Sequence, residues 1–158
     1  MFLSARDAPL DGFLCVASQV VLCFGRMVVA PGFHRAVEAH IREGAALVAE
    51  SADASGPVGG LLFGAEPPTY HVHWLVTAEH LRGAGVGRLL MAEAMRRYVT
   101  GPGTVEVVTF GPDHPGAVES GARVFYERLG FRPGDPADPG PEGGSRQLYR
   151  LDVPVRQM

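Results

Sequence analysis

Apolar side chains follow two repeats along the chain, the 3.6-residue spacing of helices and the short apolar runs typical of strands. Helical spacing predicts four helices, at residues 10–24, 33–41, 86–99 and 118–129. Apolar runs between turn-forming residues predict five strands, at residues 47–51, 58–63, 70–77, 104–110 and 147–153. The first helix is the least certain in kind, because its valines suit a strand as well.

Glycine and proline separate these elements. Pro31-Gly32 breaks the chain before the second helix, residues 53–57 predict a hairpin turn, and Pro67-Pro68 ends the hairpin. Residues 133–145 are rich in both and predict a loop without regular structure. The order is two helices, three strands, helix, strand, helix and strand. Two strand–helix–strand passages predict an α/β protein with a mixed sheet and helices on its faces.

Composition narrows the class of protein. With 158 residues, of which 46% are hydrophobic and 20% charged, the chain is long enough for one domain with a real core. Its 14 basic residues are all Arg and its net charge is −3, which argues against nucleic acid as a partner. The most apolar stretch, residues 13–29, is too polar to span a membrane and lacks the features of a signal peptide.

One segment between a predicted strand and a predicted helix is suited to bind an anion: Arg82-Gly83-Ala84-Gly85-Val86-Gly87-Arg88. Glycine lets backbone N–H groups approach a ligand, and the start of a helix points its unpaired N–H groups at the same place. The loop is not a Walker loop, because the chain has no Lys. It is not a dinucleotide fingerprint either, because Arg88 stands where the third Gly belongs. A tight strand-to-helix turn is the structural alternative.

This segment resembles the Q/R-x-x-G-x-G/A signature of the GCN5-related N-acetyltransferase (GNAT) family. Residues 122–131, ARVFYERLGF, are similar to the second block of that family, A-x-x-F/L-Y-x-x-L-G-F. The resemblance covers residues 45–153 and implies one GNAT-like domain over residues 1–158, with residues 1–44 as a variable helical part that helps to shape the acceptor pocket. The family often has Asn where this chain has Glu119, so that contact is not assigned.

The resemblance also implies a fold and a mechanism. It implies a mostly antiparallel central sheet with a V-shaped split that holds acetyl-CoA, and direct attack of an amine on the thioester. Acetyl-CoA would be held by backbone groups of one strand and by the glycine-rich loop: Leu75, Val76, Thr77, Arg82, Gly83, Ala84, Gly85, Val86, Gly87 and Arg88. Tyr126 matches the family tyrosine that protonates the departing thiolate, although it could also be a tyrosine at the edge of the core.

The base that deprotonates the amine is nominated from the residues themselves. His71 and His73 alternate on one face of the strand before the loop, and Glu106 lies on the next strand. His73 is the nominee because imidazole titrates near neutral pH, and a purely structural histidine is the alternative. Metal catalysis is rejected, because the histidines lack carboxylate or cysteine partners at ligand spacing. Cys15 and Cys23 are expected to be buried rather than nucleophilic.

The interpretation is therefore an N-acetyltransferase with a small amine as acceptor, because the acidic balance (isoelectric point about 6.0) disfavours a ribosomal or RNA-bound acceptor. Three alternatives stay open: a non-catalytic acyl-CoA sensor, a transferase for another acyl group, and a protein or peptide amine as acceptor. A cytoplasmic location in a bacterium is expected, with no membrane partner; a homodimer is compatible with the resemblance. Residues 25–32 and the pair Asp113 and His114 are further candidates for the acceptor pocket.

Overall fold

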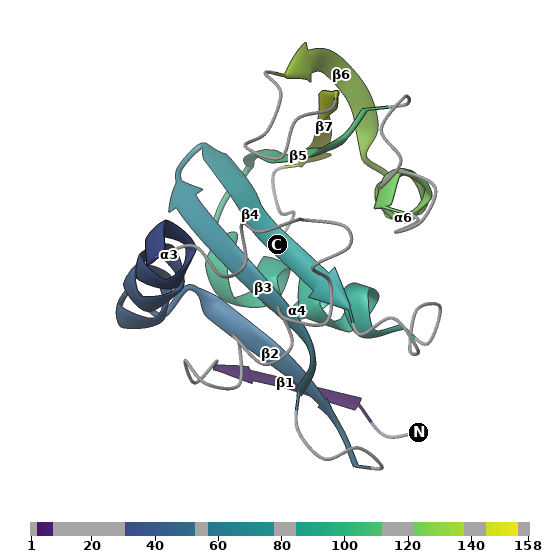
Figure 1. Ribbon diagram of the computed structural model, residues 1–158. Coiled ribbons are helices and arrows are strands. Elements are labelled where there is room, and N and C mark those ends of the chain that lie inside the picture. The colour runs from purple at the N-terminus through teal and green to yellow at the C-terminus, as the bar shows by residue number, and fades with distance from the viewer. Residues whose placement is uncertain are drawn as a thin grey trace.

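The computed structural model describes residues 3–7, 31–52, 57–77, 85–111, 122–137 and 145–154. Seven strands form one sheet in the order β1-β2-β3-β4-β5-β7-β6 (Figure 1). The strands are β1 (Leu3–Asp7), β2 (Ala46–Ser51), β3 (Pro57–Glu66), β4 (Thr69–Thr77), β5 (Gly103–Phe110), β6 (Arg132–Ala137) and β7 (Arg146–Val153). The helices of this part of the chain are α3 (Pro31–Arg42), α4 (Val86–Tyr98) and α6 (Ala122–Arg128).

The sheet is antiparallel except between β4 and β5, which confirms the predicted mixed sheet. The parallel register runs from Thr69 opposite Thr104 to Val72 opposite Val107. Beyond that pair β4 is paired with β3 alone, and β5 with β7 alone. Figure 1 shows the two strands separating beyond this point. The sheet is therefore split into a V whose vertex lies just after Val72.

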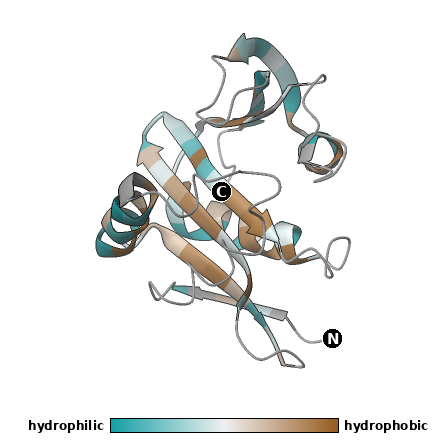
Figure 2. Ribbon diagram, in the orientation of Figure 1, coloured by the Kyte–Doolittle hydropathy of each residue, from teal (hydrophilic) through white to brown (hydrophobic). Residues whose placement is uncertain are grey.

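The core lies between α4 and the sheet. One side of α4 is buried, and its buried residues are Val86, Gly87, Leu90, Met91 and Ala94. They pack against alternate side chains of the central strands, among them Leu47, Leu61, Phe63, Tyr70 and Val105. Figure 2 shows the apolar colour concentrated on β2, β3 and β4. On the opposite face, Phe33 of α3 packs edge-on against Trp74 of β4 at 5.1 Å between ring centroids. Helices thus cover both faces.

Two strands were not predicted. β1 was missed because five residues with the sequence LSARD carry too few apolar positions for a periodic signal. β6 lies inside the segment that was predicted to be a loop, so that prediction was wrong for residues 133–137. β6 is the last strand of the sheet, and proline is tolerated on an edge strand because one side needs no N–H donors.

Other predicted element boundaries differ from the observed ones by a few residues. Pro31 and Gly32 form the first turn of α3 rather than a break before it, as suits proline at a helix start. The predicted helix at 10–24 and the start of the one at 118–129 lie outside the described residues. Within the part of the chain that is described, no helix is long and apolar enough to cross a membrane.

Candidate functional site

The last residues of β4 form one wall of the split. Leu75, Val76 and Thr77 pair with β3 alone, through Leu61, Gly60 and Gly59. Consecutive residues of a strand direct their N–H and C=O groups to opposite edges. Some backbone groups of these three residues therefore point into the split, where they can hydrogen-bond an extended ligand.

Helix α4 begins close to the end of this wall. Its N-cap is Gly85, with φ 91° and ψ 8°, and no side chain caps it among the described residues. The backbone N–H of Leu89 donates to the Gly85 carbonyl at 3.0 Å, so the N–H groups of the preceding residues have no partner within the helix. Gly85 is exposed, and a Cβ there would meet no atom within 4 Å. We call residues 82–88 the glycine loop; Arg82, Gly83 and Ala84 lie outside the described residues.

The first turn of α4 also contacts α6. Gly87 is buried, and a Cβ at that position would lie 2.9 Å from Cε1 of Phe125. The missing side chain thus lets α6, which belongs to the β5–β7 half of the sheet, approach the start of α4. Arg88, one residue later, is exposed and can reach a bound anion.

Tyr126 lies deeper than the sequence indicated. Its ring is buried among Phe125, Phe131 and Tyr149, at centroid distances of 5.0, 5.5 and 6.4 Å. Burial raises the pKa of Tyr126 well above its ordinary value of 10. The phenol is therefore protonated at neutral pH, and it lies in the core, whereas the spacing on α6 had placed it at the margin of the apolar stripe.

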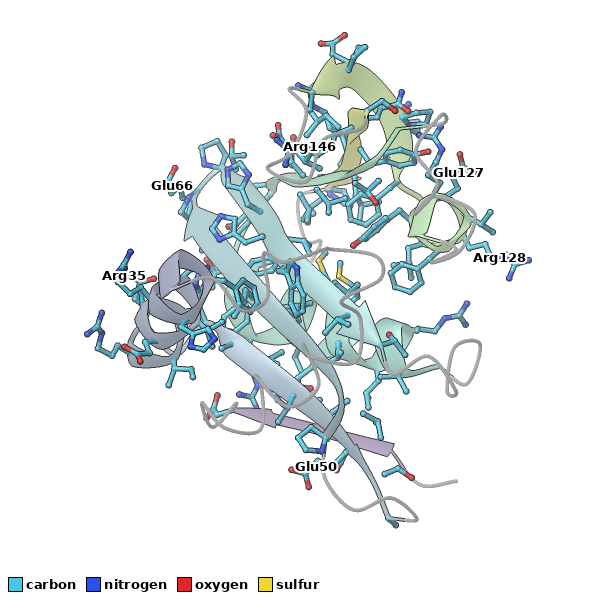
Figure 3. The ribbon with its side chains drawn as sticks, in the orientation of Figure 1. Arg35, Glu50, Glu66, Glu127, Arg128 and Arg146 are labelled. Atoms are coloured by element: carbon cyan, nitrogen blue, oxygen red, sulfur yellow. The ribbon has the colours of Figure 1, made fainter. Side chains whose placement is uncertain are left out.

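Arg123, on the polar side of α6, is half-buried. Its Nη1 donates to Oε1 of Gln147 at 2.6 Å, and its guanidinium lies 5.3 Å from the centroid of the Tyr149 ring. The Tyr149 hydroxyl donates to Oε1 of Glu127 at 3.1 Å, although Glu127 is exposed. Arg123 and Glu127 thus each contact a side chain of β7. Figure 3 shows Glu127 and Arg128 beside α6.

His73 lies at the vertex of the split. Leu62 pairs with Trp74 and the next β3 residue, Phe63, pairs with Val72, so His73 is the extra residue of a bulge in β4. Bulges redirect a side chain and occur often beside active sites. Burial of part of the ring and the imidazoles of His40 and His71 lower the pKa of His73 below 6.5. The residue is nevertheless partly exposed to solvent.

The two other strand candidates lie nearby. The ring of His71 stacks on that of His73 at 5.8 Å, which agrees with the predicted common face. Glu106 of β5 pairs with His71 across the parallel ladder, and its Oε1 accepts from Nε of Arg150 at 3.4 Å. Glu106 thus has a structural partner. The loop candidates Asp113 and His114 lie outside the described residues, as do residues 25–30.

Sequence reasoning missed the contact between His73 and α3. Nε2 of His40 lies 2.8 Å from Nδ1 of His73. The available signal was helical spacing, since His40 follows the buried residues Phe33 and Val37 by seven and three positions. That spacing directs His40 toward the sheet, but it cannot say which strand residue it meets. No three His, Cys, Asp or Glu side chains converge on a metal-sized site within the described ranges.

A known protein family matches this chain. Residues 42–133, more than half of the chain, match the model of the Acetyltransferase (GNAT) domain. The split sheet is thus that of an acyltransferase of this class. The chain belongs to the GNAT acetyltransferase family, as its motifs had predicted. A search of curated protein sequences gives no significant match.

Solved structures share the fold over nearly the whole length. A GNAT-family protein from Desulfovibrio desulfuricans is 23% identical, with a TM-score of 0.70 over 96% of this chain and 98% of its own. The ribosomal-protein-S18-alanine N-acetyltransferase from Escherichia coli is 11% identical, with a TM-score of 0.71 over 99% and 97%. A NatC complex bound to Gag peptide and CoA contains a chain that is 14% identical, with a TM-score of 0.71 over 98% and 100%. At these identities the likeness establishes the fold alone.

Proposed function

We propose that this protein transfers the acetyl group of acetyl-CoA to a primary amine, by direct attack of the amine on the thioester. The observation that supports this most is the split between β4 and β5, with the start of α4, which no described side chain caps, beside it. A split in a sheet exposes backbone groups to an extended arm, and a free helix start attracts a diphosphate. Coenzyme A has both parts.

Each part of acetyl-CoA has a matching part of the protein in this proposal. The glycine loop, residues 82–88, takes the diphosphate through its backbone N–H groups, with Arg82 and Arg88 adding positive charge. Backbone groups of Leu75, Val76 and Thr77 pair with the pantetheine arm and polarise the thioester carbonyl.

The chemistry requires two proton transfers. The acceptor ammonium loses a proton to His73, and the amine nitrogen then attacks the carbonyl carbon to give a tetrahedral oxyanion. The oxyanion collapses and the C–S bond breaks, so that the thiolate leaves and takes a proton from Tyr126. A raised pKa keeps Tyr126 protonated for this role but makes it a weak acid. Tyr126 therefore acts chiefly by donating a hydrogen bond to the sulfur atom, and this bond strengthens as negative charge develops there.

We propose a small amine as acceptor, bound by a single domain of residues 1–158 to which residues 1–44 contribute. The net charge of −3 favours a small cationic amine over an amine held on RNA. Two of the solved structures named above, however, belong to systems that bind or modify proteins or peptides. Peptide amines therefore belong in the test beside small amines.

The test is release of free thiol from acetyl-CoA over a panel of small amines, polyamines and peptide N-termini. We expect turnover with at least one small amine, and Tyr126→Phe is expected to lower kcat about 100-fold without raising KM for acetyl-CoA. Tyr149→Phe is the matched control, since it removes the hydroxyl that Glu127 accepts from and leaves kcat intact. Calorimetric binding of CoA without turnover on any amine would instead support the acyl-CoA sensor.

A further inference from the structure

We propose that His40 is a positioning residue that fixes the tautomer of His73, so that Nε2 of His73 carries the free lone pair. This inference rests on the proposed role of His73 as base. It concerns a contact between α3 and β4 that joins residues 33 positions apart in the sequence.

The direction of two hydrogen bonds decides the tautomers. Nδ1 of His40 lies 2.6 Å from the carbonyl oxygen of Ala36, which can only accept, so the proton of a neutral His40 is on Nδ1. Nε2 of His40 then has the lone pair, and it accepts from Nδ1 of His73 at 2.8 Å. A neutral His73 with its proton on Nδ1 has its lone pair on Nε2. The helix backbone is thereby linked, through two imidazoles, to the nitrogen that would act as base.

The ring of His73 is held from three sides. His40 meets it edge-on, with ring centroids 5.0 Å apart, and His71 stacks on it at 5.8 Å with an interplanar angle of 17°. The third neighbour is Gly64 of β3, where a Cβ would lie 2.8 Å from Nε2 of His73. Because Gly64 has no side chain, the Cε1–Nε2 edge of the ring can pack against the β3 backbone, while Nδ1 is occupied by His40.

The charged groups around the pair are compatible with a neutral His73. His40 from α3 and His71 from β4 lower its pKa, while Glu66 of β3 and Glu43 after α3 raise it. Figure 3 shows Glu66 at the turn between β3 and β4. On β5, Glu106 faces His71 and is paired with Arg150. The net effect, led by burial, lowers the pKa of His73.

The contact has a defined consequence for proton transfer. When His73 takes a proton from the ammonium, an N–H bond of the ammonium breaks, its electron pair stays on the amine, and a new N–H bond forms at Nε2. Nε2 of His40 still accepts from Nδ1 and stabilises the imidazolium. Without His40 the proton of a neutral His73 is free to occupy Nε2, and that fraction of the enzyme has no base.

The direct test is the tautomer of His73 in the full chain, measured by long-range ¹H–¹⁵N NMR correlation on protein labelled with ¹⁵N-histidine. We expect the Nδ1–H form in the wild type. His40→Leu removes the acceptor and shifts the population toward Nε2–H, whereas His40→Gln supplies an amide oxygen that accepts from Nδ1–H and restores it. An Nε2–H tautomer in the wild type, or an unchanged tautomer in His40→Leu, overturns the inference.

Kinetics separate the inference from the proposed function on which it rests. With the best amine of the panel, we expect His40→Leu to lower kcat/KM about ten-fold and His40→Gln to stay within about two-fold of wild type. His73→Gln is expected to remove the acid limb of the pH profile, which the lowered pKa of His73 should shift toward acid pH. Full activity in His73→Gln refutes His73 as base, whatever the tautomer. Loss of activity in His73→Gln with none in His40→Leu refutes the positioning role alone.

Discussion

At the scale of single residues, Gly85 combines a left-handed backbone conformation with a place in the proposed diphosphate site. Its φ of 91° lies in the left-handed region, which costs an L-residue about 1–2 kcal/mol. Gly44 offers a close comparison, because its φ is 71° and a Cβ there also meets no atom within 4 Å. Gly44 follows α3, whereas Gly85 precedes α4, so only Gly85 lies in the glycine loop.

We expect Gly85→Ala to weaken CoA binding at least ten-fold in titration calorimetry, because strain at φ 91° turns the N–H groups of the first helical turn away from the diphosphate. Gly44→Ala should lower the free energy of unfolding by about as much as Gly85→Ala does. Its affinity for CoA should equal that of the wild type. Equal CoA affinity in the two variants would mean that the glycine loop does not hold the diphosphate.

At the scale of elements, α4 is tied to the rest of the molecule by charge as well as by its buried stripe. Nε of Arg97 donates to Oε1 of Glu93 at 2.7 Å, and its Nη1 donates to Oδ1 of Asp7 on β1 at 2.8 Å. Arg96 also pairs with Glu93. The pair of Glu93 with Arg97 is the one that helical spacing predicts. The continuation to β1 could not be predicted, because β1 itself gives no periodic signal.

Hydrogen bonds from Arg96 and Arg97 lower the pKa of Glu93 from 4.5 to about 2. A carboxylate with a lowered pKa stabilises the folded state above its unfolded pKa, and this contribution is lost as pH falls from 4.5 toward 2. Urea unfolding at a series of pH values should therefore show a smaller loss of stability over this range for Glu93→Gln than for wild type. Parallel pH curves for the two proteins would show that the cluster adds nothing to stability.

At the scale of the whole molecule, two halves of the sheet are joined by a short parallel ladder from Thr69–Thr104 to Val72–Val107. The contact of Phe125 with Gly87 adds a second connection across the split. A ligand that pairs with β4 and binds the start of α4 adds interactions that the unfolded chain cannot make. Binding should therefore appear as global stability.

We expect CoA at about 100 times its Kd to stabilise the protein by about 2.7 kcal/mol and to raise Tm by roughly 5–10 °C. Pantetheine at the same concentration lacks the diphosphate and should raise Tm by much less. Differential scanning calorimetry measures both shifts. A pantetheine shift as large as that of CoA would locate the binding energy in the strand wall rather than in the glycine loop.

Much of this protein could be predicted from its residues because the physics involved is local. Helical spacing defined α4, since burial of one face requires that spacing, and apolar runs on both sides of turn-forming residues defined the hairpin of β2 and β3. The glycine loop was found from the order of its residues, because glycines between a strand and a helix start predict an anion site. These features are what the order of residues determines by itself.

The tertiary structure decided what depends on neighbours distant in sequence. β6 is a strand in spite of its prolines, because an edge strand forms backbone hydrogen bonds on one side only. Tyr126 is buried because Phe131 and Tyr149 close around it, and His73, the extra residue of a bulge in β4, meets His40 of α3. Such contacts are set by packing between elements, and no spacing within one element encodes them.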